Sequence, residues 1–403
     1  MWATPWPICG VGYRLGPVAK DVTTGAASQA GPATPIRILH VASCSQRRGA
    51  ELAALELADE LDRLGHRTLV GALGRAFDGG QEPGLPPLGA WRRQGPPELA
   101  LGAVRLRRLL AREPVDVVLA HGGWAAQVVA LAVPFGGPLL VWQRILGWPD
   151  KVWGGVRRRW LSTVAHRFAA AVALTDDQEA ELRCLGYRGP VWPIPNFRQP
   201  DRFRNLDRSV AARRLRAELG ITEGTPLVGF IGHLVSQKRP ERALEVLARL
   251  RSQGCPAHLV VTGTGPLRPE LEARAERLGV HTGVTFLGQR HDVEWVLGGV
   301  DLALLTSEAE GVPGVAIEAL MAGCPIVTVP VGGVTEVVEH GATGLVLDGD
   351  DPAVMAEAVA VLLADGETRG RMSRESRART DRFSASAAAA VYAERMADAL
   401  ASH

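Results

Sequence analysis

The chain has 403 residues, two to three times the length of a typical domain, so we expect two domains. Hydrophobic residues make up 46% and charged residues 22%, which excludes a mainly disordered or fibrous chain. No apolar run approaches the roughly 18 residues needed to cross a bilayer, so an integral membrane protein is not expected. The five cysteines lie far apart without CxxC spacing, which predicts neither a zinc site nor a disulfide framework and fits a reducing compartment.

Charge is distributed unevenly along the chain. Residues 36–220 carry 27 Lys and Arg against 18 Asp and Glu, a formal charge of +9. Residues 221–403 carry 16 against 24, a charge of −8. This asymmetry indicates two domains with different partners.

The first 35 residues are rich in Gly, Pro, Ala and Thr and show no helical or strand periodicity, so we expect a disordered or mis-annotated extension. They lack the basic start and apolar core of a signal peptide. From Ile36 onward, apolar runs of strand length alternate with helix-like segments, which predicts a parallel sheet covered by helices on both faces. These runs are residues 36–42, 67–73, 115–121, 138–143, 169–175 and 191–195.

The pattern restarts after an Arg-rich stretch at residues 198–220, which we interpret as a linker and a first helix. The second set of expected strands is residues 226–232, 257–263, 283–288, 300–306 and 324–330. The sequence thus predicts an α/β protein with two Rossmann-like domains, residues 36–205 and 206–383. A last helix within residues 384–403 is expected to pack back across the junction of the domains.

The segment from Thr306 to Val338 is the most informative for function. It follows an expected strand and therefore lies at the carboxyl end of a sheet, where ligands bind in doubly wound domains. Glu310 falls in the loop and Glu318 in the helix that begins after the prolyl-glycine pair at residues 313–314. The free N–H groups of that first helical turn form a site for phosphate.

This segment, E-GVPGVAI-E followed by ALMAGCPIV, resembles the E-x7-E signature of retaining glycosyltransferases of the GT-B fold, and glycosyltransferase family 4 in particular. Other segments, in the same order as in that family, extend the resemblance over nearly all of the chain after residue 35. The resemblance implies two Rossmann-like domains whose parallel sheets face each other across a cleft. The C-terminal domain would hold a nucleotide-diphosphate sugar and the N-terminal domain the acceptor.

The loop GFIGHLVSQK, residues 229–238, is a second candidate for phosphate binding. A compact ammonium suits a phosphate oxygen as a point charge, and Lys238 is one of only three lysines in the chain. The family usually places an Arg after the glycine and a Lys five residues later. Here His233 stands at the Arg position and cannot make a bidentate phosphate contact, whereas Lys238 matches.

Three further positions in the N-terminal half are candidates for the cleft. The turn SQRRGAELAAL resembles the family's glycine loop, with Arg48 in place of its first glycine and Gly49 retained. His121 ends an expected strand, either as a cleft residue or as a capping histidine whose hydrogen bonds are satisfied. Arg144 is the nearest polar residue where many family members carry a histidine.

The resemblance implies transfer of a hexose to a hydroxyl with retention at the anomeric carbon, usually without a metal or other cofactor. Glu310 and Lys238 are the expected catalytic residues. The expected donor-binding residues are Gly49, His233, Lys238, Glu310, Gly311, Val312, Pro313, Gly314, Val315 and Glu318. The alternatives are a GT-B epimerase or disaccharide synthase, and a catalytically weak subunit that binds sugar nucleotide and supports a partner.

Basic and aromatic residues at 91–93, 105–112 and 151–160 suggest an anionic partner for the N-terminal half, either a lipid-linked or anionic acceptor or a membrane surface. Such runs are also found on solvated helix faces. No nucleic-acid-binding module is recognisable. We therefore expect a cytoplasmic protein, with a peripheral position on the inner face of the membrane as an extension of that hypothesis.

Overall fold

The computed structural model describes residues 34–403, apart from residues 47–48, 76–85, 90–94 and 146–154. The chain divides into a unit Met1–Gly31, which lies outside the described residues, and a compact unit Pro32–His403. The extension expected at residues 1–35 is therefore almost entirely outside the description. So are Arg48 and the basic-aromatic residues 91–93.

The first sheet has six parallel strands in the order β2-β1-β3-β4-β5-β6. Its strands are β1 (Arg37–Cys44), β2 (Arg67–Gly74), β3 (Val117–His121), β4 (Leu139–Gln143), β5 (Ala170–Ala173) and β6 (Val191–Pro193). All six correspond to runs expected from the sequence, because strands buried on both faces are nearly continuous apolar stretches. The connecting helices are α1 (Gly49–Arg63), α2 (Pro96–Leu110), α3 (Gly123–Ala132), α4 (Gly155–Ala165) and α5 (Asp176–Cys184).

The second sheet is also parallel and six-stranded, in the order β12-β11-β10-β7-β8-β9. Its strands are β7 (Leu227–Ile231), β8 (His258–Thr262), β9 (Val284–Gly288), β10 (Leu302–Leu305), β11 (Ile326–Thr328) and β12 (Gly344–Val346). Its helices are α6 (Arg208–Leu219), α7 (Pro240–Ser252), α8 (Arg268–Arg277), α9 (Val293–Gly299), α10 (Gly314–Ala322), α11 (Pro352–Ala364) and α12 (Gly366–Ala378). Short 3-10 turns are η2 (Pro200–Arg202), η3 (Ser236–Lys238), η4 (His281–Gly283), η5 (Gly332–Glu336) and η6 (Asp381–Phe383). The edge strand β12 was not predicted, because its apolar run, residues 344–347, is shorter than the runs at 191–195 and 324–330 that contain the equally short β6 and β11.

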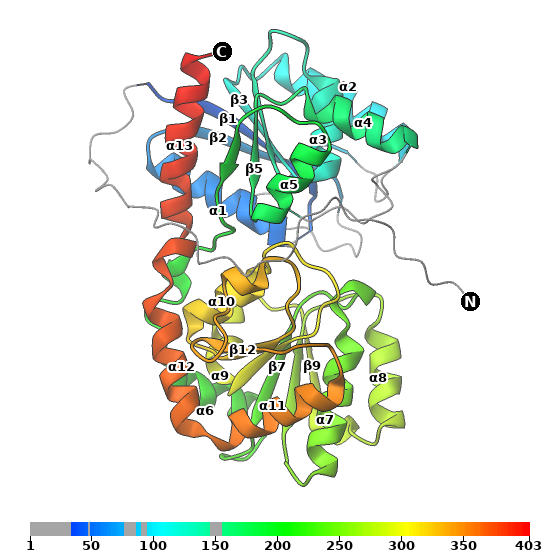
Figure 1. Cartoon of the computed structure of the whole chain (residues 1–403), viewed down its shortest axis with the longest axis vertical. Coiled ribbons are helices and arrows are strands. Elements are labelled where there is room, and N and C mark those ends of the chain that lie inside the picture. Colours follow the sequence, from blue (N-terminus) through cyan, green and yellow to red (C-terminus); the bar gives the residue numbers. More distant parts are fainter. Residues whose placement is uncertain (1–33, 47–48, 76–85, 90–94, 146–154) are drawn as a thin grey trace. The chain divides into compact units, whose positions relative to one another are not determined.

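Alternate residues of the first sheet feed two separate cores. Leu39, Val118 and Trp142 pack with α2, α3 and α4, whereas Ile38 and Val117 pack on the other face with α1. Each face thus buries branched and aromatic side chains, the pattern expected when successive side chains point to opposite sides. Figure 1 shows helices on both faces of each sheet.

The last helix, α13 (Ala385–Ala401), belongs to the core of the first sheet although it follows the second sheet in sequence. Its N-cap is Ser384, whose hydroxyl accepts a hydrogen bond from the Ala387 N–H. Tyr392 and Met396 are fully buried in the same cluster as Leu57 of α1, and Figure 1 shows α13 alongside α1. The chain therefore crosses between the two domains twice, through one passage after β6 (residues 194–207) and a second passage before α13 (residues 379–384).

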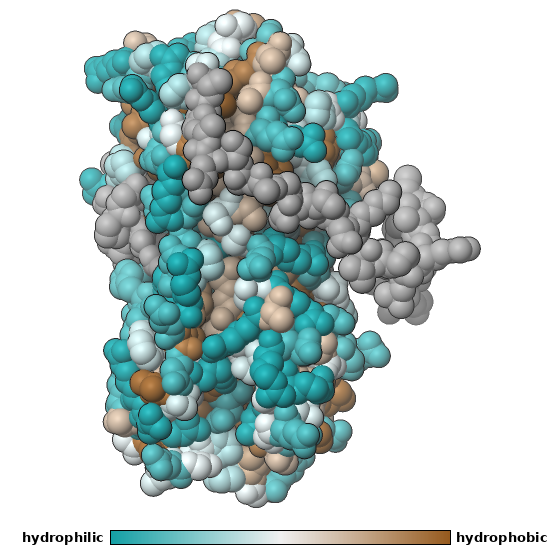
Figure 2. Space-filling model, turned by 90° about the vertical axis from the view of Figure 1, so that its left-hand side faces the viewer, coloured by the Kyte–Doolittle hydropathy of each residue, from teal (hydrophilic) through white to brown (hydrophobic). Residues whose placement is uncertain are grey.

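The two passages are hydrogen-bonded to each other. The Arg198 N–H donates to the Phe383 carbonyl at 2.9 Å, and the Ala385 N–H donates to the Arg198 carbonyl at 3.0 Å. This short parallel bridge fixes the backbone of residue 198 at the junction. On the face of the molecule drawn in Figure 2, hydrophilic side chains predominate and hydrophobic ones form small groups.

Candidate functional site

The structure brings Glu310 and Lys238 together. The Lys238 ammonium donates to Glu310 Oε1 at 2.5 Å, and the Ser307 hydroxyl donates to the same oxygen at 2.6 Å. Both loops follow neighbouring central strands, Glu310 after β10 and Lys238 after β7. The Glu310 side chain is 5% exposed and that of Lys238 24%, so the cation is the more accessible member of the pair.

Hydrogen bonds from Thr306 explain why these loops meet. Its hydroxyl lies 3.0 Å from the Lys238 carbonyl and 2.8 Å from the Arg239 carbonyl, so it can donate to either. Arg239 has a φ of 48°, a left-handed conformation, which ends the η3 turn and lets α7 start at the following proline. His233 lies in the same loop and is partly exposed.

Residues 311–313 lie between the two glutamates, lead into α10 and are tightly packed. Val312 accepts a hydrogen bond through its carbonyl from Asn196 Nδ2 at 2.7 Å, and Pro313 is the N-cap of the helix. A Cβ atom on Gly311 would lie 1.8 Å from the Ile145 carbonyl oxygen, so only glycine fits there. Gly314 and Val315 are the first two residues of α10, whose first-turn N–H groups have no partner within the helix.

Glu318 lies one turn inside α10 and is 9% exposed. Its Oε1 accepts a hydrogen bond from Arg198 Nε at 3.1 Å. Arg198 belongs to the passage after β6, and its ion pair with Glu318 was not predicted from the sequence, because 120 residues separate the two. The only signal was an arginine at the end of the largely apolar segment VWPIPNFR.

A second buried carboxyl group, that of Glu56 on α1, lies close enough to this ion pair for both of its charges to affect the Glu56 pKa. Burial raises the pKa of Glu56 to about 7, with the Arg198 guanidinium opposing that shift and the Glu318 carboxylate adding to it. Gly49, the first residue of α1, adjoins the same arginine, since a Cβ atom there would lie 3.3 Å from Arg198 Nη2. Arg48, the neighbouring candidate, falls outside the described residues.

The structure places His121 and Arg144 in the protein interior. His121 is 1% exposed and stacks on His40, with 3.1 Å between His40 Nδ1 and His121 Nε2. Burial lowers the pKa of His121 to about 4, so it is neutral at pH 7. Arg144 is 2% exposed and pairs with Glu181 of α5. Both side chains are thus buried, and each contacts another side chain, His121 that of His40 and Arg144 that of Glu181.

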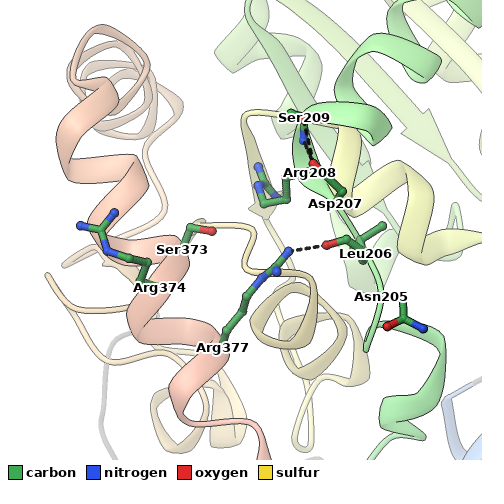
Figure 3. Close-up of a pocket in the computed structure, with 8 residues that line it drawn as sticks. All are labelled: Asn205, Leu206, Asp207, Arg208, Ser209, Ser373, Arg374 and Arg377. Atoms are coloured by element: carbon green, nitrogen blue, oxygen red, sulfur yellow. Dashed lines mark hydrogen bonds between the residues drawn. The ribbon is translucent and has the colours of Figure 1, made fainter.

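A hollow of about 450 Å³ lies between the start of α6 and α12, near the end of α10 that is opposite its first turn. Figure 3 shows the residues that line it. It is lined by Asn205, Leu206, Asp207, Arg208, Ser209, Ser373, Arg374 and Arg377. Arg377 donates to the carbonyls of Leu206 and of Ala322, the last residue of α10. Arg377 thus links the end of α10 to the start of α6, and the hollow is separate from the two glutamates.

Within the described part of the chain, no three His, Cys, Asp or Glu side chains come together as a metal site. In the same residues, no helix is both long and apolar enough to span a bilayer.

Two family profiles match the chain, one in each half. The profile described as Glycosyltransferase Family 4 matches residues 47–202, and the one described as Glycosyl transferases group 1 matches residues 212–379. The chain belongs to the glycosyltransferases of family 4 and group 1. The second match includes Lys238, Glu310 and Glu318, so the predicted donor site lies in the group 1 segment.

Curated relatives of this chain include bacterial enzymes. It is 35% identical over 199 residues to the D-inositol 3-phosphate glycosyltransferase of Corynebacterium glutamicum, covering 47% of this chain and 48% of the relative. It is 30% identical to the alpha-D-kanosaminyltransferase of Streptomyces kanamyceticus, covering 54% and 57%. The chain thus spans about half the length of the curated relatives that it matches.

Solved structures match over almost the whole of this chain. Anabaena HepE in complex with UDP-glucose has a TM-score of 0.75 and 22% identity, covering 90% of this chain and 100% of the other. WaaG, a glycosyltransferase involved in lipopolysaccharide biosynthesis, has a TM-score of 0.73 and 20% identity, covering 89% and 99%. These likenesses establish the GT-B fold, with its two parallel α/β sheets.

Proposed function

We propose that this protein is a retaining hexosyltransferase that moves a sugar from a nucleoside diphosphate to a hydroxyl acceptor. The observation that carries the proposal is the meeting of Lys238 and Glu310, 2.5 Å apart, at the carboxyl edge of the second sheet beside the start of α10. This arrangement supplies a cation and free N–H groups for a departing diphosphate, next to a carboxylate that can accept hydrogen bonds from sugar hydroxyls.

Each residue has a role in this proposal. Lys238 exchanges its contact with Glu310 for a phosphate oxygen when donor binds, and stabilises the charge that develops on the leaving group. Glu310 then accepts hydrogen bonds from the transferred hexose. Glu318 accepts hydrogen bonds from the ribose, one turn beyond the phosphates.

We infer that the donor is a UDP-hexose, since solved structures of the same fold contain UDP and UDP-glucose. An anionic polyol such as an inositol phosphate is the corresponding acceptor, because D-inositol 3-phosphate glycosyltransferases are among the relatives. The reaction needs no divalent cation in this proposal, since Lys238 and the N-terminus of α10 already offset phosphate charge. Turnover should therefore persist in EDTA.

The experiment is a donor screen followed by turnover. UDP-, GDP- and ADP-hexoses are tested for a rise in melting temperature, because a true donor stabilises the folded state by mass action. The best donor is then incubated with inositol phosphate and with neutral sugars, and release of nucleoside diphosphate is measured. Transfer with retained anomeric configuration supports the proposal. A product with inverted configuration contradicts the retaining mechanism, an isomerised donor indicates an epimerase, and binding without turnover indicates a supporting subunit.

We also propose that the α2–α3–α4 side of the first sheet meets an anionic surface, either lipid-linked acceptor or the cytoplasmic face of the membrane. Arg157, Arg158 and Arg159 are exposed on α4, Val156 beside them is 84% exposed, and Phe135 after α3 is 89% exposed. Arginine pairs with lipid phosphate while the apolar side chains enter the headgroup layer.

Flotation with vesicles of phosphatidylcholine and phosphatidylglycerol tests this surface. Recruitment is expected at low salt and release at high salt, because such attraction is screened over about 8–10 Å at physiological ionic strength. Replacing Arg157, Arg158 and Arg159 by serine should weaken recruitment, and replacing exposed arginines 249 and 277 of the second domain should not. Absence of binding at low salt would favour a soluble acceptor.

A further inference from the structure

Arg198 is an unusual residue for its position. It lies in a passage between the sheets, yet its side chain is 3% exposed and reaches the first turn of α10. Its backbone is held on both sides by hydrogen bonds to residues 383 and 385. These hydrogen bonds fix the backbone position from which the side chain extends.

The guanidinium nitrogens have different surroundings. Nε donates to Glu318 Oε1 at 3.1 Å and Nη1 donates to the Phe197 carbonyl at 2.7 Å. Nη2 lies against the first residues of two helices, 1.6 Å from where a Cβ of Gly314 would be and 3.3 Å from that of Gly49. Among the described residues, Nη2 has no hydrogen-bond acceptor.

The electrostatics of this position favour an anion. The N-termini of α1 and α10 are both positive ends of helix dipoles, and the guanidinium adds a full charge beside them. Glu318 offsets that charge through its ion pair. Glu56 does so less at neutral pH, because burial raises its pKa to about 7 and leaves it partly protonated.

We propose that Arg198 is the second cation of the donor diphosphate site, with Nη2 donating to a phosphate oxygen while Nε holds Glu318 in place. This inference rests on the proposed function, since it assigns one more residue to the same donor. It accounts for His233, which stands where the family resemblance expects an arginine and cannot make a forked phosphate contact. The planar guanidinium is supplied from the passage between the sheets instead of from the loop after β7.

The test compares a diphosphate with its nucleoside. Binding of UDP and of uridine is measured by calorimetry for the wild type and for Arg198→Met, with GDP and guanosine or ADP and adenosine run in parallel. We expect UDP affinity to fall about 10- to 100-fold, the range for a hydrogen bond to a charged group, and uridine affinity to fall much less, because uridine depends on Arg198 only through the position of Glu318. Arg204→Met is the matched control, because Arg204 lies in the same passage with its side chain 71% exposed and should change neither affinity.

Arg198→Lys covers a failure of the methionine variant to fold. Its ammonium still offsets the buried carboxylates but cannot serve Glu318 and a phosphate together, so UDP affinity should fall at least about fivefold. Undiminished UDP affinity in either folded variant would overturn the inference. So would equal losses for UDP and uridine, which would mean that Arg198 acts only through the ribose-binding Glu318. If no nucleoside diphosphate binds the wild type, the proposed function itself fails.

Discussion

Replacement of Glu56 by glutamine tests the electrostatic environment inferred for the start of α1. Glu56 is 7% exposed, and burial raises its pKa from 4.5 to about 7, against the opposing influence of Arg198. Between these two values, the folded protein binds a proton that the unfolded chain releases. The free energy of unfolding therefore falls as pH rises from about 4.5 to 7, and stays lower above pH 7.

The size of this effect follows from the shift. Each pKa unit corresponds to 1.36 kcal/mol, so the wild type loses about 3 kcal/mol of stability across this window through Glu56. Glutamine has nearly the same shape and cannot ionise. The Glu56→Gln protein should therefore gain about 2–3 kcal/mol relative to wild type on going from pH 4.5 to pH 8.

Urea unfolding followed by tryptophan fluorescence at pH 4.5, 6, 7 and 8 measures this difference. Glu336, whose pKa is also raised to about 7, is present in both proteins and cancels. Glu113→Gln is the control. Glu113 is exposed after α2, so its replacement should leave the pH dependence of the unfolding free energy as in the wild type. If the free energies of unfolding of wild type and Glu56→Gln changed in parallel with pH, Glu56 would not be held protonated, and the reasoning would be refuted.

Three further predictions concern the donor. Glu318→Gln should weaken donor binding by about 1–3 kcal/mol, measured by calorimetry; unchanged affinity would contradict a ribose contact. Lys238→Ala should lower turnover far more than melting temperature, since a partly exposed ion pair adds little to folding; a variant that unfolds or turns over normally would count against the assignment. Glu310→Ala should lose discrimination between donor sugars while still binding the bare nucleoside diphosphate, and equal losses for both ligands would indicate a structural role in the loop.

The sequence predicted every described strand except the edge strand β12. Runs such as 226–232 and 300–306 were recognisable because central parallel strands are apolar on both faces. β12 has only three residues and pairs only with β11, so its position depends on tertiary contacts. Boundaries of α13 differ from the expected 384–403 by two residues or fewer, because Ser384 is a recognisable N-cap.

The site was predictable only where its residues share a local motif. Spacing and family resemblance placed Glu310 and Glu318 around a helix start and Lys238 in the neighbouring loop. The pairing of Arg198 with Glu318 and the stacking of His40 on His121 arise from residues brought together by the sheets and their connections. No local pattern encodes such contacts, so the sequence alone could not give them.

The contact of Arg198 with Gly314 has an implication for reading related sequences. A Cβ atom at position 314 and the guanidinium of residue 198 would occupy the same space, 1.6 Å apart. The two positions should therefore vary together: relatives with a larger residue at the first position of this helix should carry a short or apolar residue in the passage. Relatives that carry an arginine at position 198 should therefore carry a glycine at position 314.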